Sequence, residues 1–138
     1  MLFASEYPYR NIVGVEFSQT FHKIAESNIR IWKNHKLKCY SIKSVCIDVL
    51  DFKLPQTPLV LFFFTPFKPI IADQVINNIR EDFTCNPRPI IIIYYGANQE
   101  FMKLLFKLNF LSKIIYPFRP LSALGQYKGY IFQSGKNI

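Results

Sequence analysis

The sequence of 138 residues has few of the side chains that build metal sites and disulfide frameworks: it contains three cysteines and two histidines. Cys39, Cys46 and Cys85 are widely spaced and form no CxxC pair. Four zinc ligands could not be assembled without using nearly every Cys and His in the chain. We therefore expect no metal site, and cysteines that stay reduced, as is usual in the cytoplasm.

Long apolar runs are also absent. The longest cover residues 59–64 and 89–95, whereas a membrane-spanning helix needs roughly 20 apolar residues. The apolar start of the chain is interrupted at once by Glu6 and Arg10, so the sequence does not read as a signal peptide. We expect a cytoplasmic protein with no membrane span.

Glycine is scarce, and each of the five glycines is isolated. The chain therefore lacks the GxGxxG fingerprint that binds dinucleotides, which argues against a nicotinamide-dependent dehydrogenase. The glycines are Gly14, Gly96, Gly125, Gly129 and Gly135.

Acidic residues are outnumbered, nine against 17 basic ones, which gives a formal net charge of +8. Such a surface favours anionic partners. The positive charge is densest at Arg30, Lys33, Lys36, Lys38 and Lys43. One hypothesis is therefore a non-catalytic basic domain that binds an anionic partner such as RNA through these residues, with an affinity that falls steeply with salt.

Half of the residues are apolar, and 14 are phenylalanine, which predicts a packed core and a single domain over residues 1–138. Strand-like apolar runs alternate with helix-like periodic segments, a pattern typical of an α/β fold with a largely parallel sheet. We predict strands at 11–17, 42–50, 59–64, 90–95, 110–116 and 127–133. We predict helices after Ser18, from Pro69, and around residues 101–108.

The faces of these elements can be predicted as well. Phe21, Ile24 and Ala25 begin a stripe at helical spacing that should pack on a sheet. The continuous apolar runs at 59–64 and 90–95 suit strands that are buried on both faces.

Acidic residues lie near the carboxyl ends of the first two predicted strands. In a doubly wound sheet, ligands bind beyond the carboxyl ends of the strands. A carboxylate at Glu16 could accept hydrogen bonds from the two hydroxyls of a ribose, or could equally be a charge that interacts with a helix dipole. Asp48 could accept from an exocyclic adenine amine while the Val49 N–H donates to a ring nitrogen, or could cap a turn. Phe17 could offer an apolar face to a purine.

The third strand ends at Thr65, Pro66 and Phe67. A polar side chain, a carbonyl held rigid by proline and an adjacent aromatic ring could hold a substrate atom in line with an electrophile. The same residues could also be a simple strand-to-helix turn.

Taken in order, these segments resemble the class I S-adenosylmethionine-dependent methyltransferases, over nearly the whole chain. The match is strongest to a bacterial group with a GVE-[LF]-S motif, an IAxxNI helix, a GDAxDFxxP segment, a strand ending FxxNPF and a PRPxxxxYY strand. This chain reads GVEFS at 14–18, IAESNI at 24–29, IDVLDFKLP at 47–55, FTPF at 64–67 and PRPIIIIYY at 87–95.

The resemblance implies a Rossmann-like fold, mostly parallel with an antiparallel closing strand, that binds S-adenosyl-L-methionine and transfers its methyl group to an unknown N or O acceptor. It implies that Glu16 holds the cofactor ribose, that Phe17 lines the adenine and that Asp48 with the Val49 backbone reads the adenine edge. Thr65, Pro66 and Phe67 would face the methyl acceptor. The family has Asn or Asp where this chain has Thr65.

The resemblance also implies a missing part, because the family fold opens with a strand and a glycine-rich loop, whereas residues 1–9 look like the end of the helix that follows them. The first strand is central in the family's sheet. Either the two neighbouring strands close up on each other, or a second chain supplies the strand, or the chain is a truncated product that folds poorly. We expect truncation, with weak or no activity.

Overall fold

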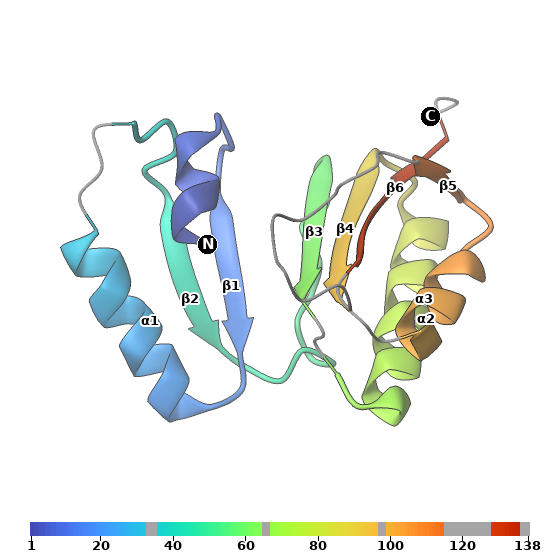
Figure 1. Cartoon of the computed structure of the whole chain (residues 1–138), viewed down its shortest axis with the longest axis horizontal. Coiled ribbons are helices and arrows are strands. Elements are labelled where there is room, and N and C mark those ends of the chain that lie inside the picture. The colour runs from blue at the N-terminus through green and yellow to red at the C-terminus, as the bar shows by residue number, and fades with distance from the viewer. Residues whose placement is uncertain (33–35, 65–66, 97–98, 115–127, 136–138) are drawn as a thin grey trace. The chain divides into compact units, whose positions relative to one another are not determined.

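The structure of the chain is a computed structural model that describes residues 1–32, 36–64, 67–96, 99–114 and 128–135 (Figure 1). The chain divides into two compact units, Met1–Phe52 and Lys53–Ile138, here named the first and the second unit. No helix within the described ranges is long and apolar enough to cross a membrane.

The first unit contains a two-stranded parallel sheet. Its elements are the 3-10 helix η1 (Leu2–Glu6), β1 (Ile12–Glu16), α1 (Gln19–Ile31) and β2 (Ile42–Cys46). Residues pair in register from Ile12 opposite Ile42 to Glu16 opposite Cys46. The helix begins after Ser18, whose side chain accepts a hydrogen bond from the Phe21 N–H, so the strand-to-helix boundary predicted from the sequence is confirmed.

The face of α1 that packs on the sheet differs from the prediction. Phe21 and Ile24 are 62% and 50% exposed, whereas His22, Ala25 and Ile29 are half-buried. The His22 ring lies 2.9 Å from the Ser44 hydroxyl of β2, so His22 lies on the helix face that packs on the sheet, together with Ala25 of the predicted stripe.

The resemblance implied that the amino-terminal segment is the end of a helix of the family fold. The structure instead has the short 3-10 helix η1 there. It packs through Phe3, whose ring meets Trp32 edge-on at 5.7 Å, and through the Ser5 carbonyl, which accepts from two backbone N–H groups. A side chain at Gly14 would collide with the thioether of Met1, so the glycine allows η1 to approach β1.

The second unit contains a mixed four-stranded sheet in the order β3-β4-β6-β5. β3 and β4 are parallel, and β6 is antiparallel to both of its neighbours, so the predicted antiparallel closing strand is present. The expected single, mostly parallel sheet is not found: the described strands form two sheets with no ladder between them. The elements are β3 (Leu59–Phe64), α2 (Pro69–Cys85), β4 (Ile90–Gly96), α3 (Gln99–Phe106), β5 (Leu111–Ile114) and β6 (Lys128–Ser134).

The core of the second unit lies between one face of this sheet and the two helices, which occupy the same side (Figure 1). Burial alternates strictly along β4, with Ile90, Ile92 and Tyr94 fully buried. Phe101 packs its ring against those of Tyr94 and Phe63. At helical spacing, Val75, Ile79, Phe101, Leu105 and Leu108 are buried, whereas Ile71, Phe83 and Leu104 are half-buried.

The opposite face of the sheet was predicted to be buried as well, and this prediction is wrong for the unit as the structure describes it. Phe62 of β3 is 65% exposed, and alternate residues of β4 are only half-buried. Because α2 and α3 share one face, no described helix of this unit covers the other. β3 is moreover an edge strand and not a central one.

A buried polar network joins α2 to the start of β4. The Arg88 side chain is 5% exposed and lies 2.6 Å from the Asp82 carboxylate. Its Nη1 also donates to the Asn86 carbonyl, and Gln56 donates to Asp82. The arginine of the PRP segment is therefore a structural residue that fixes the end of α2.

Candidate functional site

The four residues predicted to bind a cofactor lie in the first unit, where β1 and β2 end. Glu16 is the last residue of β1, and its carbonyl accepts a hydrogen bond of 3.1 Å from the Ile47 N–H just beyond β2. Parallel pairing thus continues to the point where Phe17 follows one strand and Asp48 follows the other. The backbone brings both acidic residues to the same edge of the sheet.

The Glu16 carboxylate is half-buried and is held in place by the start of α1. Its Oε1 accepts a hydrogen bond of 2.8 Å from the Ser18 N–H. A carboxylate offers about four lone-pair sites on two oxygens, so this bond orients the group and leaves acceptor capacity for further donors.

Asp48 sits in a tight turn after β2. Its Oδ1 accepts from the Leu50 N–H at 2.9 Å, and its carbonyl accepts from the Asp51 N–H at 3.1 Å. The side chain is exposed. Within the described residues, no hydrogen bond involves the Val49 N–H, so the turn presents one carboxylate and one backbone donor in adjacent residues.

The Phe17 side chain is 80% exposed. Its carbonyl accepts a weak hydrogen bond from the Cys46 thiol at 3.8 Å, so the backbone at this position is attached to β2. The arrangement places an exposed aromatic ring next in sequence to an oriented carboxylate.

The residues predicted to face a methyl acceptor belong to the second unit. Thr65 and Pro66 lie outside the described residues. Phe67 is half-buried, and its ring packs against those of Phe63 and Phe101 at 6.0 and 6.3 Å. This aromatic cluster anchors the start of the segment that leads into α2.

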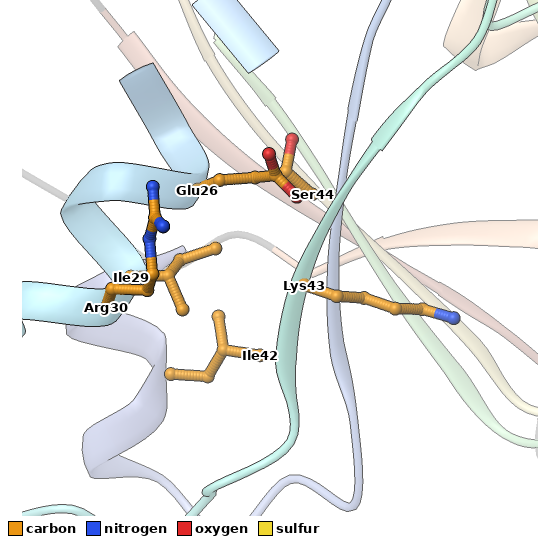
Figure 2. A pocket seen from close by; sticks show the side chains of 6 residues that line it. All are labelled: Glu26, Ile29, Arg30, Ile42, Lys43 and Ser44. Carbon is orange, nitrogen blue, oxygen red and sulfur yellow. The ribbon is translucent and has the colours of Figure 1, made fainter. Parts of the chain in front are cut away.

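The basic residues that the structure describes, Arg30, Lys36, Lys38 and Lys43, do not all line one site. Arg30 and Lys43 line a hollow of about 250 Å³ between α1 and β2, but Figure 2 shows the Lys43 ammonium group pointing away from the other lining side chains. Lys36 and Lys38 are exposed in the connection that precedes β2, and Lys33 lies outside the described residues. The hollow is therefore lined by one convergent cation, Arg30, together with the acidic Glu26.

Sequence reasoning missed the polar contact between α1 and β2. His22 contacts the Ser44 hydroxyl through Nδ1, and its Nε2 lies 3.6 Å from the Glu26 carboxylate. The spacing of His22 and Glu26, four residues apart on one helix, was a signal that could have found half of this cluster. In the part of the chain that the structure describes, no three His, Cys, Asp or Glu side chains gather as metal ligands would.

Comparison with known proteins finds a likeness in structure only. No protein-family profile and no curated protein matches the chain. The crystal structure of SMU.472, a candidate methyltransferase complexed with SAH, superposes with a TM-score of 0.51 at 17% sequence identity, over 92% of this chain and 32% of SMU.472. The chain has a methyltransferase-like fold.

A candidate methyltransferase from Thermoplasma acidophilum matches with a TM-score of 0.48 at 12% identity, over 92% of this chain and 58% of that one. The chain thus spans about a third of the length of SMU.472 and less than two thirds of the length of the second protein. At these identities the likeness shows the architecture alone.

Proposed function

We propose that this chain binds S-adenosyl-L-methionine at the carboxyl ends of β1 and β2 and acts as a class I methyltransferase. The observation that carries the proposal is the juxtaposition of an oriented carboxylate, an exposed aromatic ring and an acidic turn at one edge of a parallel sheet. Ligands of α/β folds bind beyond the carboxyl ends of the strands, and a protein with a similar fold was crystallised with SAH.

The donors and acceptors at this edge fit the adenosine part of the cofactor. Glu16, oriented by the Ser18 N–H, would accept hydrogen bonds from the ribose hydroxyls. Hydrogen bonds to a charged acceptor are stronger than neutral ones. The roughly three acceptor sites that the Ser18 N–H does not use are sufficient for the two hydroxyl donors of a ribose.

The turn after β2 would distinguish adenine from other bases. Asp48 would accept from the exocyclic amine, and the Val49 N–H would donate to the neighbouring ring nitrogen. Guanine has a carbonyl oxygen where adenine has the amine, so a carboxylate would repel it. The exposed ring of Phe17 would lie along the base and be covered by it.

The cofactor, when bound, supplies an electrophilic methyl group on a positively charged sulfur. The chain's part in transfer would be to hold an acceptor nitrogen or oxygen in line with that group and to exclude water. We propose Thr65, Pro66 and Phe67 for this role; of these, the Phe67 ring packs against those of Phe63 and Phe101.

Titration calorimetry with S-adenosylhomocysteine tests the binding proposal. We expect Glu16→Ala to weaken binding roughly 10- to 100-fold, since about 1.5–3 kcal/mol is typical of a hydrogen bond to a charged group. Asp48→Ala should weaken it as well. Glu26→Ala and Asp51→Ala are matched controls, because both remove exposed acidic residues of the same unit. Equal affinity in all four variants would refute the assignment.

A further inference from the structure

A serine, a histidine and a glutamate form a chain of contacts between β2 and α1. The Ser44 hydroxyl lies 2.9 Å from Nδ1 of His22, and Nε2 of the same ring lies 3.6 Å from the Glu26 carboxylate. His22 and Glu26 are four residues apart on one helix, so α1 itself brings them together. All three residues belong to the first unit. A hydroxyl beside a base that is oriented by a third group is the arrangement that activates a serine nucleophile.

The two contacts of His22 determine which nitrogen of its ring carries the proton. An ionised carboxylate only accepts hydrogen bonds, whereas a neutral imidazole has one donor nitrogen and one acceptor nitrogen. Glu26 therefore favours the proton on Nε2, which leaves Nδ1 as the acceptor that faces the Ser44 hydroxyl. The His22 side chain is 17% exposed, which limits the access of water to the ring. His22 is thus oriented to take the proton of Ser44.

Ser44 also lines the hollow of about 250 Å³ between α1 and β2 (Figure 2). This volume is below the roughly 300–1,000 Å³ of pockets for drug-sized ligands, so the hollow suits a small group. Ile29 and Ile42 contribute apolar walls. Arg30 lines the same hollow, and a guanidinium can stabilise the negative charge that develops on a carbonyl oxygen under attack. The hollow therefore matches a small acyl group beside the serine.

We propose that Ser44 is a nucleophile that hydrolyses small carboxylic esters, with His22 as its general base and Glu26 as the residue that positions His22. The Ser44 oxygen bonds to the carbonyl carbon, its proton passes to Nδ1 of His22, and the alcohol leaves with that proton. A water molecule then attacks the acyl-serine by the reverse route, which releases the acid and restores the Ser44 hydroxyl. This activity is separate from the proposed methyl transfer, because none of these residues is assigned to the cofactor.

Labelling of the full chain with a phosphonofluoridate, a reagent for activated serines, tests the proposal. We expect a single label on Ser44, located by mass spectrometry of peptides, because the serine oxygen displaces fluoride from phosphorus. Ser27, an exposed serine of the same unit, is the internal control and should stay unlabelled. The wild-type chain should also hydrolyse p-nitrophenyl acetate, and Ser44→Ala should lose both reactions. A chain that circular dichroism shows to be folded but that carries no label on Ser44 overturns the proposal.

Two variants test the roles of the other residues. His22→Gln should lower the rate of Ser44 labelling about 100- to 10,000-fold, the range typical of a lost general base. Glu26→Ala should lower the rate about two- to five-fold, as expected for a partly exposed ion pair, and should leave the binding of S-adenosylhomocysteine unchanged. The ¹⁵N chemical shifts of the His22 ring should show that Glu26→Ala increases the tautomer with the proton on Nδ1. Labelling of His22→Gln at the wild-type rate overturns the proposal.

Discussion

Removal of one partner of the buried ion pair between Asp82 and Arg88 should cost more than removal of both. Asp82→Leu leaves a guanidinium whose side chain is 5% exposed without its counter-charge. Breaking a buried pair in this way typically costs about 3–5 kcal/mol. We expect the lower end, about 3 kcal/mol, because the Asp82 side chain is 21% exposed and water can reach the site.

The double variant Asp82→Leu/Arg88→Met removes the unpaired charge. It also removes a guanidinium group whose hydrogen bonding is incomplete. Within the described residues, Arg88 Nε and Nη2 have no partner with hydrogen-bond geometry, although Nη2 lies close to the Asp82 carboxylate. Replacing a whole buried pair by apolar side chains is often neutral or stabilising. The double variant should therefore be at least as stable as Asp82→Leu alone.

Urea denaturation followed by circular dichroism measures these differences. The linear dependence of the unfolding free energy on urea gives the stability of each variant, provided that the slope is unchanged. An exposed pair on α3, Glu100 with Lys103, provides a control, since Glu100→Ala should change stability by less than about 1 kcal/mol. A double variant that is less stable than Asp82→Leu alone would refute the account of Arg88 as a charge buried for its partner.

Two further predictions concern the core and a helix cap. Phe101→Ala should destabilise the second unit by about 3–5 kcal/mol, because Phe101 is 1% exposed and contacts three other rings. Phe106→Ala is the control: it lies at an exposed position of the same helix and should cost far less. Equal losses of stability in thermal unfolding would contradict the packing described. Ser18→Ala should cost about 0.5–1 kcal/mol, at the low end because the hydroxyl lies 3.5 Å from the Phe21 N, and Ser27→Ala in the same helix is the control in urea denaturation.

Local sequence signals predicted the strand end where Glu16 lies, whereas the second strand ends at Cys46 and not at residue 50 as predicted. A β-branched run followed by Ser18 is sufficient to end a strand and begin a helix, and the structure has the strand and the helix at these positions. The same holds for the helix from Pro69, where proline suits the first turn.

The features that depend on distant partners could not be predicted in this way. The inner face of α1 depends on the contact of His22 with Ser44, which lies 22 residues further along the chain. Whether β3 is central or at an edge depends on which strand pairs with it, and its composition alone favoured a central position. The burial of Arg88 likewise depends on a residue elsewhere in the sequence, Asp82, whose carboxylate lies 2.6 Å from its guanidinium.

The central claim is that the edge formed by Glu16, Phe17, Asp48 and Val49 holds the adenosine part of the cofactor. An NMR titration of the isotope-labelled full chain with S-adenosylhomocysteine tests it directly. The account predicts that the largest amide shifts occur at Phe17, Ser18, Val49 and Leu50, and that Glu16→Ala abolishes them at the same ligand concentration. A folded chain that shows no shifts, or shifts centred on the hollow at Arg30, would contradict the account.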